Sequence, residues 1–399
     1  MVKSKGIVLL WLMAFFLIDV FAQPQTYTVI LSMDGFRWDY SDSFPTPHLK
    51  EMAKEGVHAR SLIPVFPTLT FPNHYSMVTG VYPDFHGVVG NQFYASDLKQ
   101  NYRYNDASAA DGRFYGAEPI WVTARKNHVK TASYFWVGSE AEIQRLRPDY
   151  WKKYSSTDTY EQRIDTVVKW LSLPINVRPR LVMLYFDYPD HLTHSVGAFG
   201  QGVKEMVIRL DSLVGVLRLK LSQLEVAKQV NFIIVSDHGM ETTNPGREVV
   251  LDNFIKQEWC ERVCGHYSFF TIETKVGYSD SVYIKLKNAP YMKIWRKADV
   301  PKRLHFGNNF RIGQYVVLAD SAYTLRWQNE KMDMKGNHGY DNQNTDMHGV
   351  FYAVGPSFKT GLSMEPFENV NIYLVLTKLL GVNAAPNNGD MKLVDKVLR

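Results

Sequence analysis

Short runs of apolar and β-branched residues alternate along the chain with longer segments in which apolar residues recur every three or four positions. The short runs predict buried strands at 26–33, 130–136, 180–186 and 230–235, and a core pattern returns at 348–354. The longer segments predict helices at 46–56, 118–127, 158–173, 202–226 and 366–380. Strands that are apolar on both faces and alternate with helices are typical of an α/β fold. We therefore expect a mostly parallel sheet with helices on both faces.

The pattern is less regular between residues 241 and 328. Here 278–287 and 315–327 predict β hairpins, on either side of a basic and aromatic helix at 289–297. We expect this stretch to be an insertion or small cap on the main sheet, within a single domain that spans residues 23–399.

The first residues have the pattern of an export signal. Lys3 and Lys5 precede an apolar run that ends near Ala22, and compact residues at the end of such a run suit signal peptidase. We expect residues 1–22 to be a signal peptide, which gives an exported protein, periplasmic or secreted, with no later membrane span. A retained signal anchor is the alternative, because the run approaches the length of a span.

Composition and charge indicate the class of protein and the partners it can bind. The 399 residues are 45% hydrophobic and 21% charged, which is ordinary for a globular protein. A net charge of +5 with scattered basic residues predicts no nucleic-acid surface, although a mild positive field favours anionic substrates. Cys260 and Cys264 are the only cysteines. They form either a local disulfide or two free thiols, and the sequence leaves both open.

Carboxylates and imidazoles cluster after the predicted strands. They are Asp34, Asp190, His194, Asp237, His238 and, in a loop rich in Gly and Asn, His338. Ligands of open α/β sheets gather at the carboxyl ends of the strands. Oxygen and nitrogen donors in this ratio suit zinc, and six are enough for two ions. Each residue alone has an ordinary alternative, such as a turn, a helix cap or a solvated loop, but their joint placement favours metal binding.

Thr70 is the candidate nucleophile. It lies in a segment that enters a predicted helix, with Pro72 near the helix start. A hydroxyl needs activation, which metal coordination supplies, and the free N–H groups of a helix start attract phosphate oxygens. Thr70 is preferred to Thr68 because it adjoins Phe71 and the helix. Asn91 offers amide donors for charge that develops on a transferred phosphoryl group; a simple turn residue is the alternative.

Several motifs together resemble a known family. They are SMDGF (32–36), PTLTFPNH (67–74), VTGVYP (78–83), HGV (86–88) with Asn91, SDHGM (236–240) and HGYDN (338–342). In this order they resemble the nucleotide pyrophosphatase/phosphodiesterase family of the alkaline phosphatase superfamily. The resemblance is to the compact bacterial type, because the additional terminal modules of larger animal members are not seen. It implies an alkaline phosphatase-like fold and a single catalytic phosphodiesterase domain.

The resemblance also implies a two-zinc site and its chemistry. One Zn²⁺ would be held by Asp190, His194 and His338, and the other by Asp34, Asp237, His238 and the Thr70 oxygen. Phosphodiester or pyrophosphate bonds of nucleotides would be cleaved through a covalent phosphothreonine, with release of a nucleoside monophosphate. Asn91 would contact a phosphate oxygen. Phe71, Tyr154 and Tyr185 would sandwich the nucleobase.

One departure from the family pattern leaves substrate choice open. The segment Asp187-Tyr188-Pro189-Asp190-His191 lacks the usual acidic pair before Pro-Asp, and His191 is a rival ligand to His194, which the spacing favours. Alternatives on the same scaffold are a lysophospholipid or choline-phosphate diesterase and a phosphomonoesterase. A surface binding module with structural zinc is the alternative from another class. The physiological substrate and the oligomeric state stay open.

Overall fold

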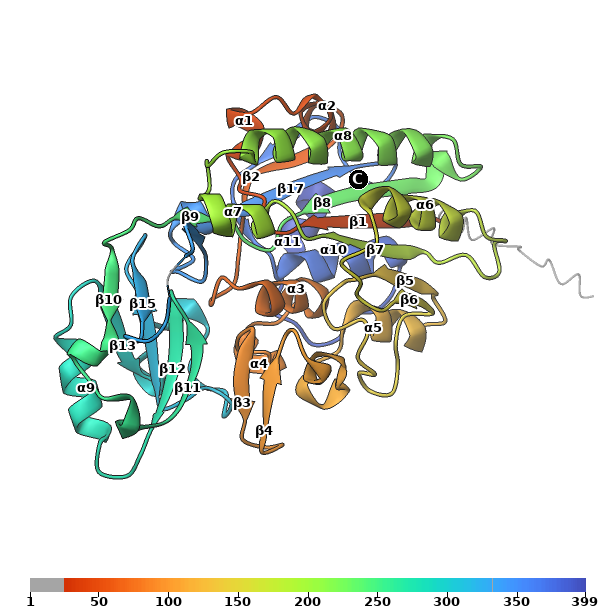
Figure 1. The fold of residues 1–399 in the computed structure, drawn as a ribbon. Helices are drawn as coiled ribbons and strands as arrows, with labels where there is room; N and C mark the ends of the chain where they lie inside the picture. Colours follow the sequence, from red (N-terminus) through yellow and green to blue (C-terminus); the bar gives the residue numbers. More distant parts are fainter. Residues whose placement is uncertain (1–24, 332) are drawn as a thin grey trace, which may run out of the picture.

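A computed structural model describes residues 25–331 and 333–399. Its central sheet has the strand order β18-β2-β17-β8-β1-β7-β5-β6, with β19 beside β2 (Figure 1). Only β17 runs antiparallel to its neighbours in this sheet. The strands are β1 (Tyr27–Met33), β2 (Val57–Ile63), β5 (Thr131–Tyr134), β6 (Tyr150–Lys152), β7 (Leu181–Phe186), β8 (Val230–Val235), β17 (Gly349–Val354), β18 (Leu362–Met364) and β19 (Phe367–Glu368). The predicted mostly parallel α/β sheet is confirmed.

Helices cover both faces of this sheet (Figure 1). One face carries α2 (Pro47–Glu55), α6 (Tyr160–Leu171) and α8 (Val203–Ser222). The other carries α3 (Thr70–Thr79), α5 (Ile120–Lys126), α10 (Asn371–Leu380) and α11 (Met391–Val397). In β1, Ile30 packs on the face that carries α3, α5, α10 and α11, whereas Val29 and Leu31 pack on the face that carries α2, α6 and α8. Successive side chains of a strand point to opposite faces of the sheet.

The insertion forms its own four-stranded antiparallel sheet with a separate core. Its strands are β11 (Cys260–His266), β12 (Phe269–Thr274), β13 (Met292–Arg296) and β14 (Tyr315–Ala319), with α9 (Ser279–Lys287) packed beside them. A separate parallel pair joins β10 (Glu248–Val250) to β15 (Thr324–Arg326). In Figure 1 this part of the chain lies to one side of the main sheet.

Three predictions for the insertion are wrong. Residues 279–287 form a helix instead of a hairpin, because Val282 and Leu286, four residues apart, are the positions that it buries. Residues 292–296 form a strand instead of a helix, because Met292 and Ile294 alternate into the core. Residues 315–327 do contain two strands, but β14 pairs with β12 and β13 and β15 pairs with β10, so they make no hairpin with each other.

The predicted helices of the main sheet are confirmed with shorter ends. The helix predicted at 366–380 begins at Asn371, because the residues before it form the short strand β19. The predicted signal peptide lies outside the described residues. No helix in the described part of the chain is both long and apolar enough to cross a membrane.

Cys260 and Cys264 are both free thiols. They lie four residues apart on β11, and at about 3.3 Å per residue this separation is far beyond the roughly 7 Å limit between the Cα atoms of a disulfide. The question that the sequence left open is therefore decided against an intramolecular bond between them.

Candidate metal centre and active site

Three adjacent parallel strands bring the candidate carboxylates together. Asp34 follows β1, Asp237 follows β8, and Asp190 opens a helix after β7. Because parallel strands end at the same edge, the three side chains meet there. Backbone bonds fix the arrangement: the Asp190 N–H donates to the Asp34 carbonyl at 3.0 Å, and the Asp34 N–H donates to the Phe186 carbonyl at 2.9 Å.

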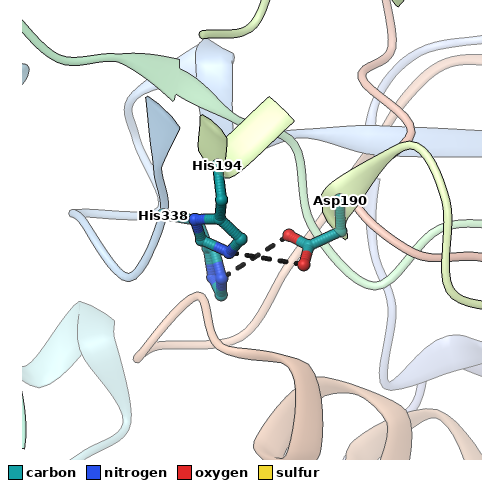
Figure 2. A group of neighbouring side chains, drawn as sticks. All are labelled: Asp190, His194 and His338. Atoms are coloured by element: carbon teal, nitrogen blue, oxygen red, sulfur yellow. Dashed lines mark ion pairs between the residues drawn. The ribbon is translucent and has the colours of Figure 1, made fainter. Parts of the chain in front are cut away.

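The first cluster consists of Asp190, His194 and His338 (Figure 2). The Nε2 atoms of His194 and His338 lie 3.3 and 3.7 Å from the two carboxylate oxygens of Asp190. Asp190 and His194 belong to the short helix α7 (Asp190–Val196), which the sequence pattern did not predict. A spacing of four residues on a helix places both side chains on one face.

His338 comes to this cluster through a small ladder that the sequence pattern did not predict. It follows β16 (Gly336–Asn337), which pairs with β9 (Glu241–Thr242), and β9 comes shortly after Asp237 and His238. The Nδ1 atom of His194 contacts the Gly336 carbonyl at 2.9 Å, which ties α7 to the same ladder.

The second cluster surrounds Thr70, the first residue of α3. The Nε2 atom of His238 lies 3.2 Å from the Thr70 hydroxyl, 3.1 Å from Asp237 and 3.5 Å from Asp34. Ligand atoms of Asp34, Asp190 and His238 also lie within 4.8 Å of one another, so the two clusters are contiguous. The expected meeting of Thr70 with six metal-ligand candidates is thus present in the geometry.

The three candidate histidines share one hydrogen-bonding arrangement. Each Nδ1 faces a backbone carbonyl: His194 faces Gly336, His238 faces Gly239 and His338 faces Thr68, at 2.8 to 2.9 Å. A carbonyl can only accept, so Nδ1 carries the proton and the Nε2 lone pair is left for the cluster. Burial lowers the pKa of His238 and His338, the latter to about 4, and neutral imidazole is the form that binds metals.

The carboxylates fit a divalent cation. Three buried oxygens, Asp34 Oδ1, Asp190 Oδ1 and Asp237 Oδ2, have no hydrogen-bond partner, although buried polar atoms are normally satisfied. Burial and the neighbouring carboxylates raise the pKa of Asp34 and Asp237 well above the ordinary value. Cations at this position would satisfy the oxygens and remove the repulsion, and the mixed nitrogen and oxygen donors suit zinc.

Tyr185 holds one of the candidate ligands in place. Its hydroxyl donates to Asp34 Oδ2 at 2.5 Å. Burial and Asp34 raise the pKa of Tyr185 well above its ordinary value, so the phenol keeps its proton. The sequence suggested only a base-stacking role for this residue; its hydroxyl also positions a carboxylate.

Replacing Tyr185 by phenylalanine should weaken metal binding. The ring stays and only the bond to Asp34 is lost, and the loss of such an outer partner costs about 10- to 100-fold in metal affinity or activity. Zinc titration by calorimetry and the rate at limiting zinc are the measurements. Unchanged zinc affinity would show that the hydroxyl does not position Asp34.

His74 belongs to the site although the sequence did not single it out. Its Nδ1 donates to the Thr70 carbonyl at 3.0 Å and lies 3.4 Å from Asp237 Oδ2, while Nε2 lies 2.8 Å from the Ser32 hydroxyl. Both ring nitrogens are therefore occupied, and His74 holds the Thr70 carbonyl at the start of α3 while its ring lies beside Asp237. The signal was its spacing: His74 is four residues after Thr70, on the same face of α3.

A cavity of about 1000 Å³ opens above the two clusters and is lined by Thr70, Phe71, Asn91, Tyr154 and Tyr185 among others. Asn91 Oδ1 accepts the backbone N–H of Phe71 at 2.9 Å. This bond turns the carbonyl end of the amide towards the helix start, so its NH₂ is the end that remains for a ligand. Tyr154 is 49% exposed, and its ring lies 5.0 Å from that of Phe135.

Asp187 and His191 flank Asp190 in the segment that departs from the family pattern. Both line the cavity, and neither belongs to a cluster of metal-ligand candidates. Asp187 forms an ion pair with the buried Arg163 at 3.1 Å, and the His191 ring packs on Tyr188. Of the two rival histidines, His194 is the one whose nitrogen lies beside Asp190, which agrees with the interpretation from spacing.

Fold and site together define a class. A mostly parallel sheet covered on both faces, with a hydroxyl and two contiguous groups of metal-ligand candidates at its carboxyl edge, is an alkaline phosphatase-like arrangement. The family model "Type I phosphodiesterase / nucleotide pyrophosphatase" matches residues 28–341. The chain therefore belongs to the nucleotide pyrophosphatase/phosphodiesterase family, and it is a phosphodiesterase of that family.

Individual relatives agree with this assignment. Ectonucleotide pyrophosphatase/phosphodiesterase family member 7 of Rattus norvegicus is 36% identical over 391 residues, which cover 94% of this chain and 88% of the relative. The bis(5'-adenosyl)-triphosphatase of Xenopus laevis is 35% identical over 370 residues, 91% and 79% of the two chains. The structure of an inactive variant of murine ectonucleotide pyrophosphatase/phosphodiesterase 5 in complex with AMP matches with a TM-score of 0.90 and 31% identity, over 94% of this chain and all of that one.

Proposed function

We propose that the protein is a zinc-dependent hydrolase of phosphodiester and pyrophosphate bonds in nucleotides, which releases nucleoside monophosphates through a covalent phosphothreonine. One observation carries the proposal: the Thr70 hydroxyl lies at the start of α3, 3.2 Å from His238, where two groups of metal-ligand candidates meet below an open cavity. The names of relatives and the AMP in the related structure support nucleotides as the substrate class.

The proposed zinc sites use the two clusters. Asp190, His194 and His338 would hold one ion, and Asp34, Asp237, His238 and the Thr70 oxygen would hold the other. Bound zinc ions would lower the pKa of the nucleophilic hydroxyl and offset negative charge on the phosphoryl oxygens and the leaving oxygen. The backbone carbonyls that bind Nδ1 of the three histidines keep Nε2 directed at these sites.

The chain's own groups would act on the phosphoryl group in two displacements. Thr70 Oγ1 forms a bond to phosphorus while the bond to the leaving oxygen breaks, and the leaving group takes up a proton. Water then displaces Thr70 from phosphorus, which frees the monophosphate and restores the hydroxyl. The Asn91 NH₂ donates to a phosphoryl oxygen in both steps, a role that its bond to the Phe71 N–H prepares.

The nucleobase would lie between aromatic side chains of the cavity. Phe71 and Tyr154 both line it, and bases stack on such rings without strong sequence preference. Tyr185 would contribute the edge of its ring near the metal centre. A domain that spans residues 23–399 with its insertion at 241–328, and export after cleavage of residues 1–22, complete the proposal; the prefix "ecto" in the names of relatives is consistent with export.

Tyr154→Ala should raise KM for nucleotide substrates by about tenfold or more, because stacking on an aromatic ring contributes about 1–3 kcal/mol per base. The turnover number should change less, since Tyr154 belongs to neither cluster of metal-ligand candidates. Steady-state kinetics on a nucleotide ester measure this. Tyr154→Phe keeps the ring and should behave like the wild type; an equal loss in both variants would contradict a stacking role.

A substrate panel tests the function itself. Rates on the p-nitrophenyl ester of thymidine monophosphate, on p-nitrophenyl phosphate and on glycerophosphocholine separate a nucleotide phosphodiesterase from a monoesterase and from a choline-phosphate diesterase. We expect the first substrate to have the highest kcat/KM. A preference for glycerophosphocholine would overturn the proposed substrate class while leaving the metal site intact.

A further inference from the structure

One wall of the cavity has no role in the chemistry described above. It is the tip of the β11–β12 hairpin, residues 265–269, which the insertion extends to the main sheet. The tip is fixed from two sides: the Ser268 hydroxyl donates to the His338 carbonyl, and the Leu325 N–H donates to the Tyr267 carbonyl at 2.7 Å. Tyr267 has a φ of 62°, a left-handed conformation that is uncommon for a bulky residue. A tip held in this way presents its side chains in defined positions.

His266 is a second polar side chain of this tip that reaches another part of the cavity wall. Its Nδ1 lies 2.7 Å from Nε2 of Gln92, which directly follows Asn91 and begins β3 (Gln92–Ala95). An amide nitrogen can only donate, so Nδ1 accepts and the ring proton resides on Nε2. The contact with Gln92 thus leaves the Nε2 N–H of His266 to donate a hydrogen bond to a ligand.

The position of His266 relates it to the leaving group. Ser268, two residues after His266 in the same tip, donates from its hydroxyl to the carbonyl of His338, a member of the first cluster. The Tyr154 ring instead packs on Phe135, on another part of the cavity wall. In an in-line displacement the leaving oxygen departs opposite the nucleophile. With Thr70 in the second cluster, the leaving group extends past the first cluster, towards His194 and His266.

We propose that His266, oriented by Gln92, is a leaving-group site that donates a hydrogen bond from Nε2 to a phosphate oxygen beyond the scissile bond. The site favours pyrophosphate bonds, whose leaving group carries a phosphate, over phosphodiesters whose leaving group is a neutral alcohol or phenol. The inference rests on the proposed function and specifies which nucleotide bonds are preferred. His266 is a specificity residue and Gln92 is a positioning residue.

The test compares two substrates that share the transferred nucleotide and differ in the leaving group. These are the p-nitrophenyl ester of adenosine monophosphate, and diadenosine triphosphate. His266→Ala should lower kcat/KM for diadenosine triphosphate about tenfold or more, the effect of one hydrogen bond to a charged oxygen, and should leave the p-nitrophenyl ester within about twofold. His266→Gln retains a donor and should recover part of the loss. Gln92→Ala should lower kcat/KM for diadenosine triphosphate, relative to that for the p-nitrophenyl ester, by a smaller factor.

Tyr154→Ala is the matched control, because both substrates carry the base and both should lose kcat/KM alike. Equal losses on the two substrates in His266→Ala, or no loss on diadenosine triphosphate, would overturn the leaving-group site. If the wild-type protein cleaved neither substrate, the proposed function itself would fail, which the wild-type rates reveal before any variant is compared.

Discussion

Thr70→Ala is expected to abolish turnover, with a loss of at least about 10,000-fold in kcat, because removing the nucleophile of a covalent mechanism leaves only binding and electrostatic stabilisation. The backbone of α3 begins at Thr70 and does not depend on its side chain. The melting temperature should therefore stay within about 2 °C of the wild type. Steady-state hydrolysis of a p-nitrophenyl nucleotide ester and a thermal melt measure the two quantities.

Thr70→Ser is the control for this prediction. It keeps a hydroxyl at the same position and should retain measurable turnover, and rapid quench followed by intact-protein mass spectrometry should detect a transient phosphoryl adduct in the wild type. Near wild-type hydrolysis by Thr70→Ala would show that another group attacks phosphorus. Thr68 is not a rival on structural grounds, because its buried hydroxyl donates to the Tyr340 carbonyl and accepts the Gly339 N–H.

Removal of bound metal should stop the reaction without unfolding the protein. Metal ions contribute several kcal/mol to stabilising a phosphoryl transition state, so chelation should lower the rate at least about 1000-fold. The two cores that cover the main sheet are built from apolar side chains outside the clusters. Far-UV circular dichroism of the chelated protein should thus remain native, and metal analysis of the untreated protein should give two zinc ions per chain.

The metal ion that restores activity to the chelated protein identifies the kind of metal that the site uses. Zn²⁺ should restore activity, whereas Mg²⁺ and Ca²⁺, which prefer oxygen ligands, should not, because three of the seven proposed side-chain donors are imidazoles. Loss of the native spectrum on chelation would instead indicate structural zinc and would favour the binding-module alternative. Full activity after exhaustive chelation would contradict a metal-dependent mechanism.

The periodicity of apolar residues predicted helices and strands correctly where one kind of residue dominates a segment. The apolar runs of β1, β7 and β8 and the stripe of α8 were predicted at their true positions. It failed in the insertion, where aromatic and basic residues conceal the pattern: Val282 and Leu286 mark a helix, and Met292 and Ile294 mark a strand. Such short segments contain only two informative positions each, and the core that they meet decides between the two structures.

The candidate site also contains residues that the sequence selected and contacts that only the structure shows. Residue type and position after a strand were enough to select Asp34, Asp190 and Asp237, because parallel strands bring their carboxyl ends to one edge wherever they lie in the sequence. The role of Tyr185 as a donor to Asp34, the placement of His74 beside Asp237, and the contact between Gln92 and His266 were not predictable. Each of these depends on the distance between side chains that are 151 to 174 residues apart in the chain, and no local pattern encodes that distance.

The sequence by itself thus determined the family and the fold class and predicted a nucleophile and a set of metal-ligand candidates, because these follow from local residue chemistry and from the order of strands and helices. Only the tertiary structure decided which nitrogen of each histidine faces the centre, since that depends on carbonyls of Gly336, Gly239 and Thr68. It also decided that the insertion contributes His266 to the cavity, because the hairpin meets Gln92 only after the two sheets have packed together.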